Sequence, residues 1–173
     1  ALRECVSRGI LSNLIIPIVE PVKVSSTYTK TVDSFIEANK AIAIIRNPQV
    51  GSWTKDLKKE SNAKIREQAI GQLKDVNVIP SFYVTPMLSA CIKNAAQNGT
   101  DIESLLLLCN NPEYIGDYEE VIGDNTPLYN IIPDKGDFRR RIRLNRVMCE
   151  DHFPKQTRNI DYLNIDTEFF SSD

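Results

Sequence analysis

The chain has 173 residues, of which 42% are hydrophobic and 25% are charged, and its formal net charge is −2. These values are typical of a globular protein with one substantial core, so we expect a single domain. The slightly negative charge argues against a protein that binds nucleic acid through bulk positive charge. No apolar run approaches the roughly 20 residues of a membrane-spanning helix, and no signal-peptide pattern precedes the first predicted strand, so we expect a cytoplasmic protein.

The first residues predict the end of a helix and then a strand. Leu2, Val6 and Ile10 recur at four-residue spacing within residues 1–11, which is the periodicity of a helix that packs on a sheet. No initiator Met and no helix N-cap precede them, so we expect the sequence to begin inside a longer protein. The apolar run at residues 14–19 then predicts the first strand.

Five more apolar runs predict strands further along the chain. In the first of the six, residues 14–19, the apolar side chains do not alternate with polar ones, which is typical of a strand that is covered on both faces. Pro17 and Pro80 are unusual members, because proline cannot donate to the hydrogen-bond ladder of a central strand. Together with the first, the predicted strands are residues 14–19, 41–45, 78–84, 104–109, 128–132 and 146–149.

Helical periodicity separates these runs. Ser25 offers a hydroxyl N-cap, Pro112 suits a first helical turn, and Gly71 would divide a long helical region into two pieces. Helices between successive strands are the usual crossovers of a parallel sheet. The predicted helices cover about residues 25–39, 54–75, 87–97, 112–123 and 136–144.

About six strand–helix units leave two parallel architectures open. An open doubly wound sheet would use mainly its switch point for function, whereas a barrel brings every strand end to one rim. The polar residues that follow most strands favour the barrel. Because a complete (β/α)₈ barrel takes about 250 residues, we expect an incomplete, TIM-barrel-like α/β domain over residues 1–173, truncated at both ends. Its sheet should be open along the first or the sixth strand and expose apolar surface that another segment covers.

Polar residues mark the ends of the predicted strands. We expect them on one edge of the sheet, since the carboxyl ends of parallel strands meet there. These residues are Glu20, Asn47, Thr85, Asn111, Asp134 and Asp151. A carboxylate directly after an apolar strand is hard to explain by packing alone, so Glu20, Asp134 and Asp151 are the candidate catalytic residues. The candidate ligand-binding residues are Lys23, Asn47, Thr85 and Asn111.

Such a rim suits two kinds of chemistry. Two or three carboxylates can hold Mg²⁺ or divide the roles of general acid and general base. A phosphate-bearing ligand would suit Lys23 together with backbone N–H groups at the starts of helices. We expect a shared pocket in which Glu20 faces inward, Lys23 stands at its edge and Asn47 supplies an amide. The alternative is that Glu20 caps a neighbouring loop or pairs with Arg46.

Several familiar sites are set aside. No G-x-S-x-G, G-x-G-x-x-G or G-x-x-x-x-G-K-[ST] motif is present, which excludes the corresponding hydrolase, dinucleotide and P-loop interpretations. The four cysteines are widely spaced and accompanied by one histidine, His152, so we expect reduced thiols rather than a structural zinc site. His152 and Asp151 are neighbours on an extended segment and point to opposite sides. Asn and Thr before proline, as at Asn47, Thr85 and Asn111, are also ordinary loop residues.

One cluster of positive charge lies near the last predicted helix and strand. It consists of Arg139, Arg140, Arg141, Arg143 and Arg146. In a helix, Phe138 and Ile142 share the inward face while Arg139 and Arg143 face outward. We expect a solvated surface, to which residues 159–173 contribute acidic partners. Binding of nucleic acid or an acidic protein through Arg139, Arg140, Arg143 and Arg146 is the less favoured alternative.

Three stretches carry a resemblance to a known family. They are IIPIVEPVK at residues 15–23, AIAIIRNPQVG at 41–51 and RNIDYLNIDTEFFSSD at 158–173. Over most of its length the chain resembles the bacterial and phage-associated "beta protein" family. The resemblance implies a protein that extends beyond both ends of this sequence, and some relatives in mobile or phage-defence neighbourhoods. It implies no catalytic residues.

Two functional hypotheses follow. The first is a ligand-binding protein or enzyme whose site lies at the carboxyl rim of a TIM-like barrel, with phosphate-related chemistry as one option. The second is a non-catalytic component of a phage, mobile-element or defence complex, which uses the arginine cluster and the aromatic tail. Its partner would be another protein or the remaining part of the same protein. Neither hypothesis involves a membrane.

Overall fold

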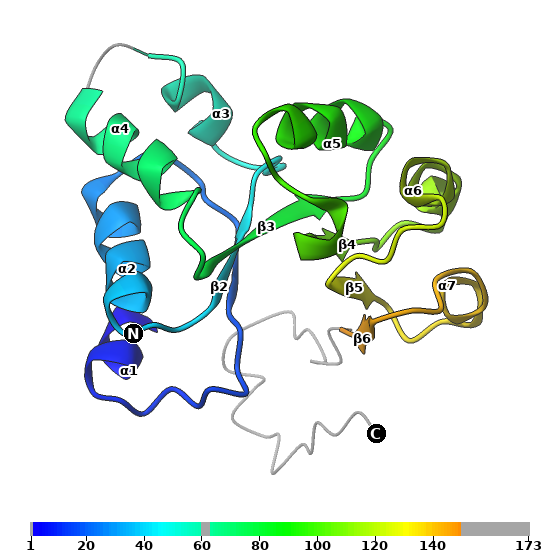
Figure 1. Cartoon of the computed structure of the whole chain (residues 1–173), viewed down its shortest axis with the longest axis horizontal. Coiled ribbons are helices and arrows are strands. Elements are labelled where there is room, and N and C mark those ends of the chain that lie inside the picture. Colours follow the sequence, from blue (N-terminus) through cyan, green and yellow to red (C-terminus); the bar gives the residue numbers. More distant parts are fainter. Residues whose placement is uncertain (1, 60–62, 150–173) are drawn as a thin grey trace, which may run out of the picture.

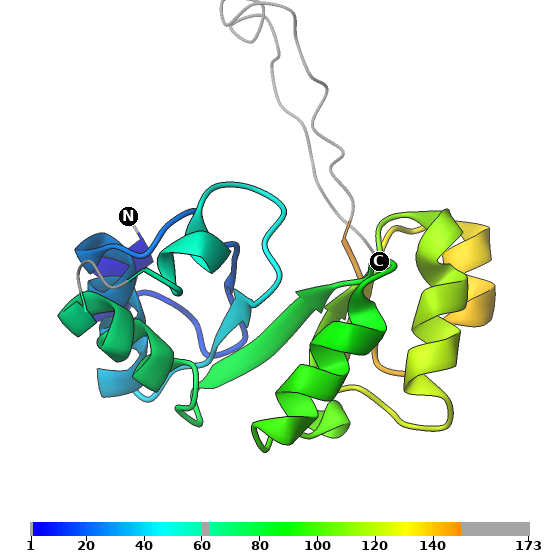
Figure 2. The same ribbon diagram turned by 90° about the horizontal axis from the view of Figure 1, so that it is seen from above.

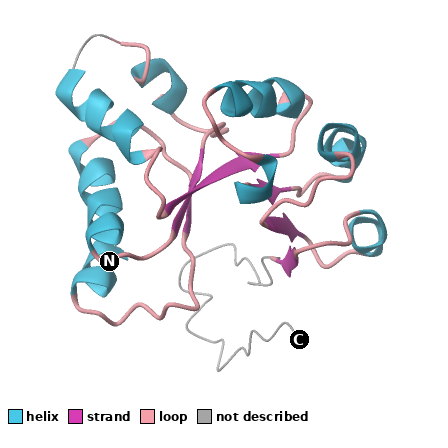
Figure 3. Cartoon of the chain, in the orientation of Figure 1, coloured by secondary structure: helices cyan, strands magenta, loops and turns pink. Residues whose placement is uncertain are grey.

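In the part of the chain that the structure describes, six strands and seven α-helices alternate (Figures 1 and 3). The structure is a computed structural model that describes residues 2–59 and 63–149. Each strand lies within one of the six predicted ranges, which confirms that the apolar runs are strands. The strands are β1 (Ile18–Val19), β2 (Ile42–Ile45), β3 (Val78–Tyr83), β4 (Leu106–Leu108), β5 (Tyr129–Ile132) and β6 (Arg146–Met148).

The helices confirm the predicted crossovers between strands. Ser25 caps the second helix, because its hydroxyl accepts a hydrogen bond from the backbone N–H of Tyr28 at 3.3 Å. No helix in the described part of the chain is long and apolar enough to cross a membrane. The α-helices are α1 (Leu2–Ser7), α2 (Ser26–Glu37), α3 (Trp53–Asp56), α4 (Ala63–Gln72), α5 (Leu88–Gln97), α6 (Ile115–Ile122) and α7 (Gly136–Arg141). Two 3₁₀ helices, η1 (Ile102–Ser104) and η2 (Pro112–Tyr114), flank β4.

The sheet is parallel throughout, and its strand order is that of the sequence, from β1 to β6. A doubly wound sheet reverses its strand order at a switch point, and this sheet does not. The alternative of a doubly wound sheet is therefore wrong, and the barrel-like prediction is confirmed. Figures 1 and 2 show a curled sheet with the helices along its convex side. The fold is a half-barrel.

Two apolar clusters fill the space between the sheet and its helices. The first gathers around Phe35 and joins α1 and α2 to β2, from which Ile42 and Ile44 point outward. The second is larger and joins α5, α6 and α7 to β3, β4 and β5, with Leu107 and Phe138 among its fully buried members. Residues two apart in a strand share a face, so these clusters identify which residues face the helices.

The intervening strand residues face the concave side of the sheet. Val19 packs against the helices, so Glu20, the next residue, turns to the concave side. Ile45 has the same orientation in β2 and is in register with Ser81 of β3. Tyr83 lies two residues beyond Ser81 and therefore shares the concave side with Glu20. Both residues lie at the carboxyl edge of the sheet.

Pro80 sits in β3 at a position where no neighbouring strand needs its missing N–H. Backbone N–H groups point alternately to the two sides of a strand, and the N–H of Val84 donates to Leu108 of β4 at 2.8 Å. Position 80, four residues earlier, is directed to that same side. However, β4 begins only at Leu106, which is in register with Ser81. The proline therefore removes no ladder hydrogen bond.

Two predicted boundaries are wrong. The first strand is short, because Pro17 has no N–H to donate and contributes only its carbonyl oxygen, which accepts from Ala43 N–H at 2.9 Å. The long helical region is interrupted after Asp56 rather than at Gly71, which lies inside α4. The sequence after Asp56 is rich in lysine and offers no apolar stripe that could pack on the sheet.

Candidate functional site

The parallel strands place five of the predicted site residues along one edge of the sheet. Each of the five follows the carboxyl end of a strand, and these ends meet at the same edge. They are Glu20, Asn47, Thr85, Asn111 and Asp134. The sixth, Asp151, and its neighbour His152 lie outside the described residues. Sharing an edge does not bring the side chains into contact, and their individual partners differ.

Glu20 and Tyr83 meet over the concave side of the sheet. One carboxylate oxygen of Glu20 accepts a hydrogen bond from the Tyr83 hydroxyl at 3.1 Å. The other accepts from the backbone N–H of Gln49 at 2.6 Å. Both side chains are half-buried. Burial, followed by the hydrogen bond to Glu20 and the charge of its carboxylate, raises the pKa of the Tyr83 hydroxyl, so tyrosine remains the proton donor of the pair.

Tyr83 is a site residue that the sequence reasoning missed. Its position within an apolar strand gave it the same appearance as its buried neighbours. The available signal was its alternation with Ser81, since a hydroxyl two residues away marks a face of β3 that is not purely apolar. The contact with Glu20 joins β1 to β3 across the intervening strand.

The Asn47 side chain forms hydrogen bonds with the backbone of β3. Its side-chain NH₂ donates to the Tyr83 carbonyl at 2.9 Å, and its side-chain oxygen accepts from the Tyr83 N–H at 2.8 Å. These two bonds continue the pairing of β2 with β3 beyond the end of β2. The amide that we expected Asn47 to supply to a ligand is thus mainly engaged by the sheet.

The remaining rim residues cap turns or lie at the surface. The Thr85 hydroxyl accepts from Met87 N–H at 3.3 Å, and the Asn111 side chain accepts from Glu113 N–H at 3.0 Å, so both act as local caps. Asp134 pairs with Arg139 at 3.1 Å, and both side chains are 50% exposed. These contacts match the alternative of ordinary loop residues for Thr85 and Asn111 and differ from the predicted ligand and catalytic roles.

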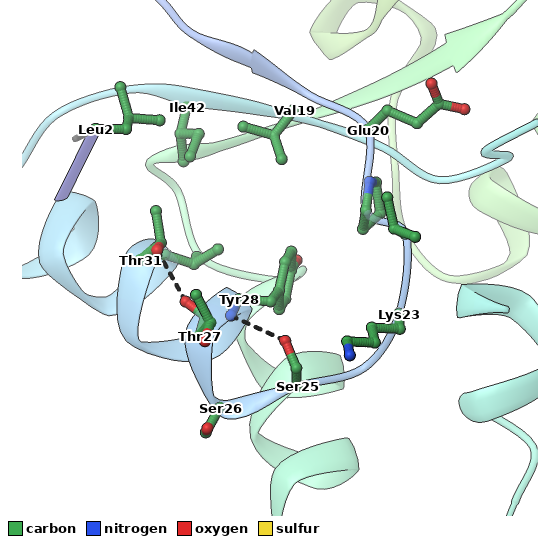
Figure 4. A pocket seen from close by; sticks show the side chains of 13 residues that line it. Leu2, Val19, Glu20, Lys23, Ser25, Ser26, Thr27, Tyr28, Thr31 and Ile42 are labelled. Carbon is green, nitrogen blue, oxygen red and sulfur yellow. Dashed lines mark hydrogen bonds between the residues drawn. The ribbon is translucent and has the colours of Figure 1, made fainter. Parts of the chain in front are cut away.

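Glu20 and Lys23 both line one cavity beside β1. This cavity of about 650 Å³ is enclosed by the segment from β1 to α2, with apolar residues such as Val19 and Ile42 and with polar residues at the start of α2. Figure 4 shows the Glu20 carboxylate directed away from the other side chains around this cavity. The predicted shared pocket of Glu20 and Lys23 is therefore present, but the Glu20 carboxylate does not face into it.

Arg46 is turned to the opposite face of the sheet from Glu20. Its guanidinium donates to the Leu73 carbonyl at 2.7 Å and to the Thr100 hydroxyl at 3.2 Å. The suggested ion pair between Glu20 and Arg46 is therefore wrong. The suggested loop cap is present, since Glu20 holds the N–H of Gln49.

The described residues do not form a metal centre. Within residues 2–59 and 63–149, no three His, Cys, Asp or Glu side chains gather closely enough to hold an ion. The predicted Mg²⁺ site would therefore need groups from elsewhere, because Glu20 and Asp134 have separate partners. The four cysteines are free thiols, as expected. Burial raises the pKa of the Cys109 thiol to about 12.

The arginines of α7 and β6 have partners close by. Arg140 pairs with Asp137, and Arg141 pairs with Glu119 of α6. Arg143 and Arg146 donate to the backbone carbonyls of Arg140 and Arg139 at 2.9 and 2.8 Å. The inward residues Phe138 and Ile142 are buried as predicted. This arrangement agrees with a solvated surface, on which Arg139, Arg140 and Arg141 are paired with carboxylates while Arg143 and Arg146 donate to neutral carbonyl groups.

Comparison with known proteins found no match among family models, curated proteins or solved structures. The resemblance to the beta protein family, with its bacterial and phage association, therefore stays a prediction.

Proposed function

We propose that this chain binds a small molecule at the carboxyl edge of the half-barrel, on the concave side of β1, β2 and β3. The observation that carries the proposal is the contact between Glu20 and Tyr83. A carboxylate and a phenol from two non-adjacent strands converge where barrels of this type place their ligands. A half-buried carboxylate with spare acceptor capacity is a polar anchor beside an apolar face.

The ligand group that fits this anchor is a hydrogen-bond donor. Glu20 receives two hydrogen bonds from the protein, and a carboxylate can accept about four, so two acceptor positions remain. Lys23 lines the cavity from which the Glu20 carboxylate is directed away, and Arg46 is bonded on the helix side of the sheet. An amine or hydroxyl group therefore suits this site better than phosphate, which the carboxylate would repel.

The same pair has the groups needed for proton transfer. Glu20 is the group that would accept a proton from a bound hydroxyl or amine, and Tyr83 would hold the carboxylate in position. Tyr83 is a phenol and therefore a proton donor at neutral pH, and the raised pKa of its hydroxyl extends this donor role to higher pH. An enzymatic activity of this kind is the catalytic form of the proposal, and ligand binding is its minimal form.

The test is a titration followed by NMR of the backbone amides. Ethanolamine, inorganic phosphate and Mg²⁺ are added separately to the chain and to its Glu20→Gln, Tyr83→Phe and Lys23→Ala variants. We expect ethanolamine to shift the Gln49 amide saturably in the chain and in Lys23→Ala, and not in Glu20→Gln. Tyr83→Phe should weaken the binding severalfold without abolishing it.

Other outcomes point elsewhere. A phosphate response at the start of α2 that disappears in Lys23→Ala would move the ligand to the cavity in Figure 4. Absence of binding by all three probes, with a loss of stability as the only effect of Glu20→Gln, would show that Glu20 merely fastens the loop at Gln49.

A further inference from the structure

Most side chains on the concave face of the sheet are apolar, and their exposure rises toward both edges. Ile45 of β2 and Leu106 of β4 face this side, and each is only 2% exposed. Ile18 of β1 and Val147 of β6 face the same side at the two edges, and they are 38% and 40% exposed. Inner strands are thus enclosed by the curl of the sheet, whereas the edge strands turn apolar side chains to an open side.

Both edges of the sheet also have unpaired backbone groups. Along the described residues β1 pairs only with β2, and β6 pairs only with β5. The segments that lead into these edge strands are apolar and exposed as well: Leu14 before β1 is 94% exposed, and Leu144 before β6 is 60% exposed. An open parallel edge with apolar surroundings is a template for another strand.

We propose that this surface receives a strand–helix–strand–helix segment, which inserts two parallel strands between β6 and β1 and closes the barrel. The segment would come from polypeptide other than residues 1–173. Two strands are the number required, because eight parallel strands enclose an interior that side chains just fill, and six are present. The proposal does not depend on the identity of any ligand at the rim.

The chemistry of the partner follows from the surface that it covers. Its strands present Val, Ile or Leu toward Ile18 and Val147, and their backbones complete the ladders of β1 and β6. Its helices lie in the outer layer, where they cover Leu14 and Leu144. A second copy of this chain does not fit this description. It would bring six strands at once, and a barrel of twelve is too wide for the nearly buried Ile45 and Leu106 side chains to fill.

The test uses a photo-crosslinking amino acid at residue 18 or residue 147 of the chain, produced in the cells that naturally make it. Val76, which is 93% exposed in the turn before β3, is the matched control position. We expect both edge positions to cross-link to one segment that contains two apolar strands separated by a helix. The control position should give no such product. Cross-links to a second copy, cross-links to residues 150–173, or no cross-links at all would overturn the proposal.

The isolated chain supplies an independent measurement. Its open face should bind the dye 8-anilinonaphthalene-1-sulfonate, and Ile18→Lys or Val147→Lys should reduce this binding severalfold. Val76→Lys should leave it unchanged. An isolated chain that is monomeric, binds no dye and protects the β1 and β6 amides from hydrogen exchange has no open face, and that result would also overturn the proposal.

Discussion

Gly51 is the residue at which the loop after β2 touches the loop after β1. Its φ is +79°, and a Cβ at this position would lie 2.1 Å from the carbonyl oxygen of Val22. The N–H groups of Ser52 and Trp53 donate to that same oxygen at 2.7 and 3.1 Å. The absence of a side chain therefore allows two backbone segments to pack directly, beside the rim where Glu20 binds Gln49.

Gly51→Ala should destabilise the protein by about 2 kcal/mol or more, because it combines a left-handed conformation with a clash against backbone. Urea denaturation measures the change. Gly71→Ala is the matched control, since a Cβ in the last turn of α4 meets no atom within 4 Å and should leave the stability unchanged or raise it by up to about 1 kcal/mol. Similar stabilities for the two variants would contradict this account of the loop contact.

Asn47 stabilises the sheet beyond the last residue of β2. Asn47→Ala removes the side-chain groups that bond to the N–H and the carbonyl of Tyr83. It should lower the free energy of unfolding by about 1–3 kcal/mol, since two half-buried backbone groups lose their hydrogen bonds. Hydrogen exchange of the Tyr83 amide should accelerate at the same time. Asn98→Ala, which removes one exposed bond to the Asn94 carbonyl, should leave that amide unchanged. An unaltered Tyr83 amide in Asn47→Ala would show that its protection comes from burial alone.

Cys109 makes stability dependent on pH. Burial raises the pKa of its thiol from 9.0 to about 12, with Arg141 opposing this slightly. The unfolded chain loses the proton near pH 9 and the folded protein does not, so this contribution is complete below pH 9 and is lost as the pH rises toward 12. Between pH 9 and pH 10, the free energy of unfolding of Cys109→Ala should fall by about 1 kcal/mol less than that of the unchanged chain. Urea denaturation at the two pH values measures this difference. Cys149→Ala, at an exposed thiol, should behave like the unchanged chain.

At the scale of single elements, α7 is attached by its apolar face. Phe138→Ala should cost about 3–5 kcal/mol, because Phe138 is 1% exposed within the larger apolar cluster. Arg140→Ala removes a surface pair with Asp137 and should change the free energy of unfolding by about 0.5 kcal/mol or less. Thermal or urea unfolding compares the two. A larger loss from Arg140→Ala would mean that the charges hold this helix.

The elements could be predicted from sequence more fully than the site. Apolar runs predicted the strands, and Ser25 and Pro112 predicted the starts of helices, because these sequence signals are local. The contact between Glu20 and Tyr83 depends on the relative register of three strands, which no local pattern encodes. The sequence identified Glu20 because its carboxylate follows an apolar strand. The direction of that carboxylate, away from the side chains around the cavity, depends on the curl of the sheet and could not be predicted from local sequence.

At the scale of the whole molecule, β3 connects the two apolar clusters. Its first residue, Val78, packs with the cluster around Phe35, whereas Phe82 packs with the cluster around Leu107. Ser81 is in register with both Ile45 of β2 and Leu106 of β4, and it is fully buried. The two apolar clusters of the half-barrel are therefore connected by one continuous strand, β3.

The strand order also has a consequence for synthesis. Each strand pairs with the strand that was made just before it, so the sheet can grow in the order in which a ribosome delivers the chain. Each addition requires the closure of a single crossover, and its entropic cost rises only slowly with crossover length. During translation every new strand is for a time the free edge that awaits the next. Among the described residues, the unpaired side of β6 is that growing edge preserved in a folded polypeptide.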